Sequence, residues 1–348
     1  MAEKERWYFG GKRMEVVNTY KYLGIYFSTK LSVSYACQDL VARATRATIC
    51  ILKTMYRFEK SSAPLFLKLF DCQVQPILQY GAEIWAFVGR DIIEKTHLFA
   101  LKRFLGVDRR TPNEFVYGEF GRYPLYLNSY VRCLKYWLKI ICMDDERLPC
   151  KAYKMLYQLD QNGKKNWVTY VRECLCHYGF RYVWDNQGVG DVNSFLRCFK
   201  ERIVDCKWQD WHNHINNSDR YSFYCQFKSN SSIEPYMNIS MNRYVVKALV
   251  YFRLGISSMI VHKQRYKENI SNNMSCRLCG IGTENEIHIV LCCSELQNIR
   301  HELIPAKFYR HPSLFRLNLL LANQNEKILE NLALYLYKCF KLLEHACA

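Results

Sequence analysis

The chain has 348 residues, of which 50% are hydrophobic and 15% aromatic. A chain of this length can bury a sizeable core, and this composition excludes general disorder. Its 49 lysine and arginine residues outnumber 32 aspartate and glutamate residues, which gives a formal net charge of +17 and a pI near 9.1. Such an excess favours a polyanionic partner, DNA, RNA or an anionic membrane, although a solvated basic surface would give the same composition.

We expect neither a membrane-spanning segment nor a secretion signal in this sequence. No apolar run approaches the roughly 20 residues that a membrane-spanning helix needs. Residues 1–11 are charged from residue 3 onward and contain no apolar core, so we expect no signal peptide there. The 17 cysteines are an odd number, and most stand singly in apolar segments. We therefore expect reduced thiols and an intracellular protein, with nucleus and cytoplasm both open.

The pattern of residues predicts a mainly α-helical fold with a short β structure at the N-terminus. Gly10-Gly11 predicts a β-hairpin, and the aromatic run 20–27 predicts a further strand. Between residues 160 and 240 the periodicity weakens and predicts only short aromatic-rich segments. One predicted helical stretch runs from Pro64 toward Trp85, with a break at Pro76 and Gly81. Another covers 93–105 and ends at Gly106. Further helices are predicted over 133–143, 244–265 and 317–343.

The first predicted helix, which begins near Gln38, has an apolar face and a basic face. Its apolar residues recur at steps of three and four, from Leu40 to Met55. At 100° per residue, its basic side chains fall within about 80° of one another. These are Arg43, Arg46, Lys53 and Arg57. The basic face fits a solvated surface, and it also fits a helix laid along a phosphate backbone.

The strongest chemical signal is a cluster of cysteine and histidine near the C-terminus. Cys276 and Cys279 can present two thiolates to one metal ion from a tight turn, for which Gly280 suits the backbone. His288 and one cysteine of the pair Cys292-Cys293 would complete a tetrahedral set, and mixed sulfur and imidazole ligands suit zinc. Four protein ligands leave no open position, so we expect a structural site. The alternative is a loop of reduced cysteines.

The fourth ligand depends on the backbone that follows His288. On a regular helix the i, i+4 spacing puts Cys292 on the face of His288, whereas i, i+5 turns Cys293 away by about 140°. If the helix frays or ends there, Cys293 can reach the site. A second candidate site is the pair Asp144-Asp145, which resembles the paired metal-binding aspartates of polymerases. Because the pair follows a predicted helix, we expect it to lie at a helix end and in a loop rather than on a catalytic hairpin.

Several motifs in order resemble the C-terminal portion of LINE-type (non-LTR) retrotransposon reverse transcriptases. The resemblance covers nearly the whole chain and ends with the Cys/His cluster followed by Arg300. The matching segments are Tyr20-Lys21-Tyr22-Leu23-Gly24-Ile25, the run from Pro76 to Trp85 (Pro-Ile-Leu-Gln-Tyr-Gly-Ala-Glu-Ile-Trp), Lys102 to Gly106 and Tyr117 to Leu125. The family's register implies Cys293 as the fourth ligand, with Cys292 as the alternative.

The resemblance also implies roles for the other segments. Tyr22 would lie near the primer end, and the helices between 38 and 106 would correspond to the thumb. The family's catalytic Ala-Asp-Asp hairpin precedes the Tyr-Leu-Gly strand, and only 19 residues precede Tyr20. Because nucleotidyl transfer needs paired carboxylates that hold two metal ions, we expect no polymerase activity from this chain alone.

We therefore predict a nucleic-acid-binding fragment of a reverse transcriptase with a structural zinc ion. Its partners would be RNA or DNA and possible further retrotransposon proteins, with no membrane and no small-molecule substrate. Its expected nucleic-acid contacts are Tyr22, Arg43, Arg46, Lys53 and Arg57. One alternative is a helical protein-interaction scaffold, and another is part of an active reverse transcriptase if the chain belongs to a longer protein. The expected segments are an end-of-palm hairpin and strand (1–36), thumb-like helices (37–125), a helical connecting region (126–268), a zinc knuckle (269–300) and a C-terminal helix (301–348).

Overall fold

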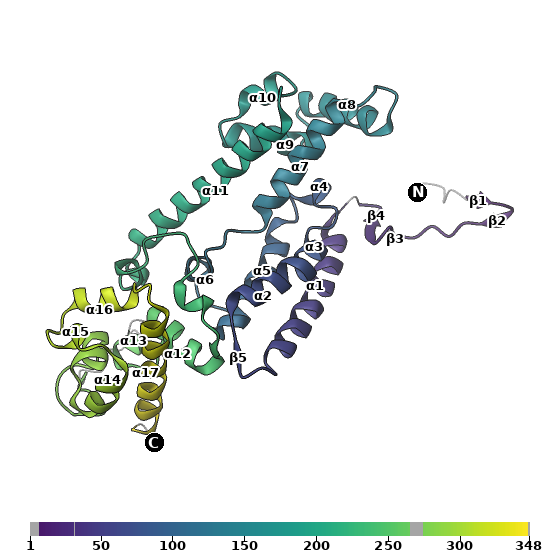
Figure 1. Cartoon of the computed structure of the whole chain (residues 1–348). Coiled ribbons are helices and arrows are strands. Elements are labelled where there is room, and N and C mark those ends of the chain that lie inside the picture. The colour runs from purple at the N-terminus through teal and green to yellow at the C-terminus, as the bar shows by residue number, and fades with distance from the viewer. Residues whose placement is uncertain (1–6, 31, 265–273, 347–348) are drawn as a thin grey trace.

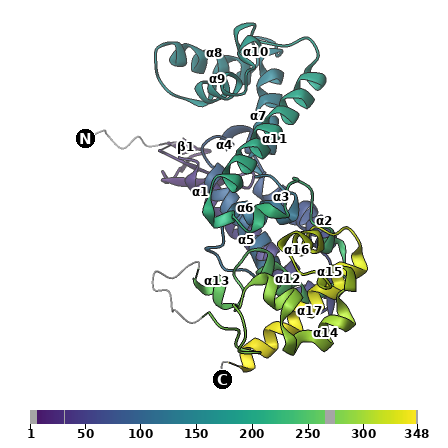
Figure 2. The same ribbon diagram turned by 90° about the vertical axis from the view of Figure 1, so that its left-hand side faces the viewer.

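The structure is a computed structural model that describes residues 7–30, 32–264 and 274–346. The fold is mainly α-helical with a few short strands, as the sequence predicts. Figures 1 and 2 show a central group of helices, a second group at one end of it and a third group, which holds the C-terminus, at the other. None of the helices in the described residues is both long enough and apolar enough to cross a membrane. Each cysteine that the structure describes is a free thiol.

Two small hairpins form the N-terminal part. Strands β1 (Tyr8–Phe9) and β2 (Lys12–Arg13) pair around Gly10-Gly11, which confirms the predicted hairpin. The single strand expected over 20–27 is wrong, because strands β3 (Thr19–Tyr22) and β4 (Ile25–Ser28) pair with each other. Leu23 and Gly24 have φ angles of 46° and 83°, the left-handed conformation that a two-residue hairpin turn requires.

The central group begins with the long helix α1 (Ser34–Met55) and ends at α6 (Asn113–Phe120). The break predicted at Pro76 and Gly81 is present: a π-helix (Phe70–Val74) precedes Pro76, and Gly81 has a φ of 71°. Gly106 ends α5 with a φ of 69°, as predicted. The helices between α1 and α6 are α2 (Ala63–Leu69), α3 (Gln75–Leu78), α4 (Ala82–Trp85) and α5 (Arg90–Leu105).

The second group contains helices that the sequence pattern did not reveal. Helix α11 (Val192–Asn216) lies in the stretch expected to hold only short segments. It buries Phe195 to Ile203 at one end and Trp211 to Ile215 at the other, so no continuous apolar stripe marks it. The other helices are α7 (Tyr126–Ile141), α8 (Leu148–Gln161), α9 (Trp167–His177) and α10 (Arg181–Asp185), and 3₁₀ turns follow α11 at Asp219–Tyr221, Tyr224–Gln226 and Pro235–Asn238.

The C-terminal group is more broken than expected. The helix predicted over 244–265 is two helices, α12 (Arg243–Arg253) and α13 (Ile260–Gln264), and Arg265 lies outside the described residues. The helix predicted over 317–343 is also two, because Asn325 caps a new helix by accepting a hydrogen bond from the Ile328 amide. The remaining elements are α14 (Gln297–Leu303), α15 (Ala306–Tyr309), α16 (Leu314–Leu321), α17 (Glu326–His345) and the pair β5 (Lys60–Ser61) with β6 (Met241–Asn242).

The buried apolar side chains form two cores. The larger contains residues from 37–125 and from 211–343, so the central and C-terminal groups share one interior. The smaller contains residues from 127–203 together with Ala86. Helix α11 contributes to both cores, and Figure 1 shows it running from the second group toward the C-terminal group.

A buried ionic network joins the central and C-terminal groups. The Nε atom of Arg253 on α12 lies 3.1 Å from Oε2 of Glu119 on α6, and its Nη2 atom lies 2.6 Å from Oε2 of Glu234. Lys228 contacts Oε1 of Glu234 at 2.6 Å, and the Tyr224 hydroxyl donates to Glu119 at 2.8 Å. Burial raises the pKa of Glu119, but Arg253 and Lys228 lower it more, so Glu119 is ionised at neutral pH.

We predict that Arg253→Met lowers the free energy of unfolding by about 3–5 kcal/mol, because it leaves two carboxylates buried without their partner. Urea denaturation measures this change. Arg181→Met is the matched control, because Arg181 pairs with Asp185 on the surface and such pairs contribute about 0–1 kcal/mol. Equal, small losses in both variants would show that the buried network does not hold the two groups together.

Candidate metal centre and nucleic-acid interface

A tight turn brings the first two predicted ligands together. The Cys276 amide donates to the Gly282 carbonyl at 2.9 Å, and the Gly280 amide donates to the Cys276 carbonyl at 2.8 Å. Gly280 and Gly282 have φ angles of 68° and 75°, a conformation that residues with a Cβ atom rarely adopt. A Cβ atom on Gly282 would also stand 3.4 Å from Nδ1 of His288. The sequence thus folds Cys276 and Cys279 toward one point.

A π-helical turn supplies the other two side chains. The segment His288–Cys292 is a π-helix, and the Cys293 amide donates to the His288 carbonyl at 2.7 Å. In such a turn residue i+5 lies above residue i, so the α-helical argument for Cys292 does not apply. Cys293 is buried beside Cys276, with their sulfur atoms 3.9 Å apart, whereas Cys292 is exposed.

The four side chains form a group that could hold a metal ion. The ligand atoms of Cys276, Cys279, His288 and Cys293 all lie within 4.8 Å of one another. Sγ of Cys279 lies 3.3 Å from Nε2 of His288. Burial and nearby Arg300 lower the pKa of His288, which favours the neutral imidazole that binds metals. Burial and Cys276 raise the pKa of Cys293 to about 12, so a metal ion has to displace its proton.

Buried polar side chains behind the cluster fix the π-helical turn. Arg300 donates from Nε to the Val290 carbonyl at 2.9 Å and from Nη2 to the Cys293 carbonyl at 2.7 Å. The Tyr335 hydroxyl donates to the Ile289 carbonyl at 2.7 Å. These bonds satisfy carbonyl groups that the end of a helix leaves without partners.

A second set of polar contacts, which sequence reasoning missed, ties the cluster to the segment after α12. Glu284 is fully buried and accepts from the Ile260 amide at 2.9 Å and from Nε of Arg277 at 2.8 Å. Arg277 in turn donates to the Ser258 carbonyl at 2.9 Å. Nε2 of His262 lies 3.1 Å from Glu286. The partners are distant in sequence, and no local spacing signals them. The polar segment expected before the cluster lies outside the described residues up to position 273.

The structure separates the basic residues predicted on the first helix. Arg43 is half-buried, pairs with Asp39 at 2.9 Å and donates to the Gly24 carbonyl at 3.2 Å, so it holds the β3–β4 hairpin against α1. Arg46 and Lys53 are exposed on α1. Arg57 is not on this helix, because α1 ends at Met55. The prediction that all four basic residues lie on one helix is therefore wrong for Arg57. Tyr22 is exposed on β3.

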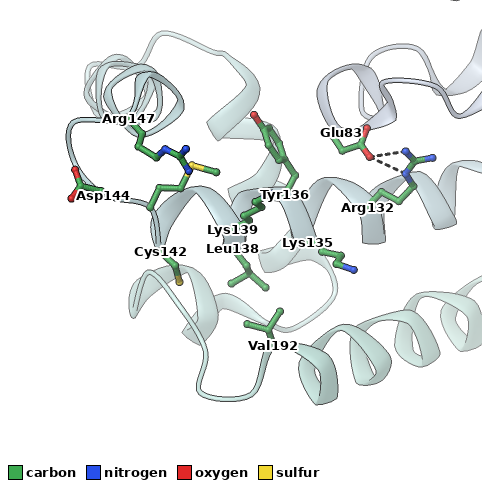
Figure 3. A pocket seen from close by; sticks show the side chains of 11 residues that line it. Glu83, Arg132, Lys135, Tyr136, Leu138, Lys139, Cys142, Asp144, Arg147 and Val192 are labelled. Carbon is green, nitrogen blue, oxygen red and sulfur yellow. Dashed lines mark hydrogen bonds and ion pairs between the residues drawn. The ribbon is translucent and has the colours of Figure 1, made fainter.

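A cavity lies beside α7 (Figure 3), and Asp144 of the second sequence candidate is among its lining residues. Its volume is about 1170 Å³, and Arg132 pairs with Glu83 at its edge at 2.6 Å. Lys135 and Lys139 are exposed, and no ion pair involves them within the described residues. Asp144 lies in the loop after α7, as predicted, with its carboxylate accepting from the Glu146 amide.

No family model, no curated protein and no solved structure matches the chain. The resemblance to LINE-type reverse transcriptases therefore depends on the quoted sequence motifs alone, and function has to be argued from the chain's own residues.

We predict that Cys293→Ser abolishes stoichiometric metal binding and that Cys292→Ser leaves it unchanged. Of these two cysteines, only Cys293 is turned toward the other ligands. Loss of a ligand should lower the metal affinity by more than the roughly 10–100-fold that loss of a supporting contact costs. Titration with Co²⁺, followed by visible absorption, measures binding in both variants. Metal retained by Cys293→Ser and lost from Cys292→Ser would contradict the π-helical arrangement.

Proposed function

We propose that this chain is a nucleic-acid-binding protein with a structural zinc ion, of the kind found at the C-terminal end of LINE-type reverse transcriptases. The observation that carries this proposal is the group of three cysteines and one histidine with ligand atoms within 4.8 Å. Thiolate and imidazole ligands together suit zinc better than the hard cations, which prefer oxygen. Because the set is complete with four protein ligands, the ion would stabilise the fold rather than bind a substrate.

Surface charge supports a nucleic-acid partner. The net charge is +17, and several cations of the described surface have no carboxylate partner, among them Arg46, Lys53, Arg103 and Arg243. Lysine and arginine side chains without a carboxylate partner are free to neutralise phosphate groups. This neutralisation stabilises the complex because it releases the counterions condensed on the nucleic acid. The resemblance points to the same partner, RNA or DNA. Polymerisation is not part of the proposal, because it would require the family's catalytic carboxylates.

Purified protein should contain about one zinc ion per chain. Cys276→Ser should remove it, because this thiol is buried in the centre of the cluster. Chelation should also lower the melting temperature of the wild type, since metal binding to a site formed only in the folded state stabilises that state. Elemental analysis and thermal melts measure both effects. Stoichiometric zinc in the Cys276→Ser variant would remove this site from the proposal.

Affinity for nucleic acid should fall steeply with salt. Each phosphate neutralised on duplex DNA contributes about −0.9 to the slope of log K against log salt, so about four contacts predict a roughly 100-fold loss between 50 and 200 mM. Fluorescence anisotropy with labelled oligonucleotides measures this slope. An affinity that barely changes with salt would count against the electrostatic proposal and would favour a protein-interaction scaffold that uses zinc only for stability.

A further inference from the structure

A groove lies where α12 crosses the ends of α1 and α5, and we call it the basic groove. Its central cavity encloses about 480 Å³. Two neighbouring cavities of about 660 and 640 Å³ share lining residues with it, Arg103 on one side and Lys247 on the other, so the groove continues in both directions. The cations and tyrosines that line the central cavity are Lys53, Tyr56, Arg103, Arg243, Tyr244 and Lys247.

The basic groove collects unbalanced positive charge. Lys53, Arg103, Arg243 and Lys247 are all exposed, and the central cavity has no acidic lining residue. Within the described residues no ion pair engages any of these cations. Like charges that face one groove repel one another, and a polyanion laid between them removes that repulsion. The groove therefore favours a ligand with several negative charges in a row.

Aromatic rings line the same groove, and one of them is held in place by a hydrogen bond. The Tyr56 hydroxyl donates to the Arg103 carbonyl at 2.8 Å, so this ring is fixed to the end of α5. The guanidinium of Arg243 lies 4.7 Å from the centre of the Tyr56 ring and 4.8 Å from that of Tyr244. Tyr244 remains 53% exposed, although it belongs to the first turn of a well-packed helix. An exposed ring beside cations can serve as a platform on which a base stacks.

We propose that the basic groove binds single-stranded nucleic acid, with its phosphates on the four cations and a base stacked on Tyr244; this inference rests on the proposed nucleic-acid function. The exposed aromatic ring favours a single strand over a duplex. In a duplex the bases already stack on one another and offer no free face, whereas an unpaired strand can stack its bases on aromatic side chains. Phosphate contact and stacking are available to both RNA and DNA, so both are probes in the test.

The aromatic part is tested with Tyr244→Leu in the full, zinc-loaded chain. Loss of one base-stacking ring should weaken binding of 20-nucleotide oligo(dT) and oligo(U) by about fivefold or more and leave binding of a 20-base-pair DNA duplex unchanged. Tyr182→Leu is the matched control, because Tyr182 on α10 is similarly exposed at 56% and lies outside the groove. Far-ultraviolet circular dichroism and zinc content verify that both variants are folded.

The charged part is tested with the double variant Arg243→Gln/Lys247→Gln. Removal of two phosphate contacts should make the salt slope for single strands shallower by about 1.4, since each contact contributes about 0.7. Lys135→Gln/Lys139→Gln is the matched control, with the same i, i+4 spacing and the same change of charge on α7. This control should keep the wild-type slope, because its lysines lie at the α7 cavity shown in Figure 3.

The outcomes separate this inference from the proposed function. If the wild type binds oligonucleotides but the groove variants behave like their controls, the nucleic-acid function stands and the groove is not its site. If the wild type prefers the duplex and Tyr244→Leu changes nothing, the groove does not select single strands. If the wild type binds neither strand type at 50 mM salt, the proposed function itself fails.

Discussion

The arrangement of this protein depends on one buried cation. Arg253 is almost completely buried, and its guanidinium contacts Glu119 of α6, Glu234 and the Leu321 carbonyl at the end of α16. A buried guanidinium costs several kcal/mol unless its hydrogen bonds are satisfied, so these partners are held in fixed positions around it. The same helix, α12, carries Arg243, Tyr244 and Lys247 in its first turns. The network thus sets the position of the basic groove relative to the central helices.

The metal centre is connected to the same helix from its other end. Residues 256–258 and Lys263, which follow α12, line the cavity next to the basic groove, and the Ser258 carbonyl among them accepts a hydrogen bond from Arg277. Glu284 and Glu286 contact Ile260 and His262 of the same segment. A metal ion on the four ligands would fix the turn that carries Glu284. It would therefore also fix one wall of the neighbouring cavity. The proposed zinc ion would then influence the proposed nucleic-acid binding through a short chain of hydrogen bonds rather than through direct contact with the nucleic acid.

Local rules predicted a good part of this structure. Helical periodicity found α1, α5 and α7, and Gly10-Gly11, Gly81 and Gly106 marked turns because only glycine adopts positive φ angles easily. The features that local rules missed depend on distant contacts. Helix α11 packs against two different cores and shows no single stripe. Helical spacing favoured Cys292, because the π-helical turn that presents Cys293, the ligand that the resemblance implied, is stabilised by Arg300 and Tyr335 from other helices. The Cys276, Cys279 and His288 part of the site could be predicted because ligand spacing in a tight turn is a local property.

Several residues of the motifs behind the resemblance pack and pair within the protein itself. Glu83 of the Gly-x-Glu-x-Trp segment pairs with Arg132, and Glu119 of the Tyr-Gly-Glu segment pairs with Arg253. The Trp85 indole donates to the Tyr80 carbonyl at 2.9 Å, and Gly81 between them has a positive φ. These side chains hold helices together. These three motif residues therefore have a structural role in this chain, whereas the argument for a ligand comes from the exposed cations and rings of the basic groove.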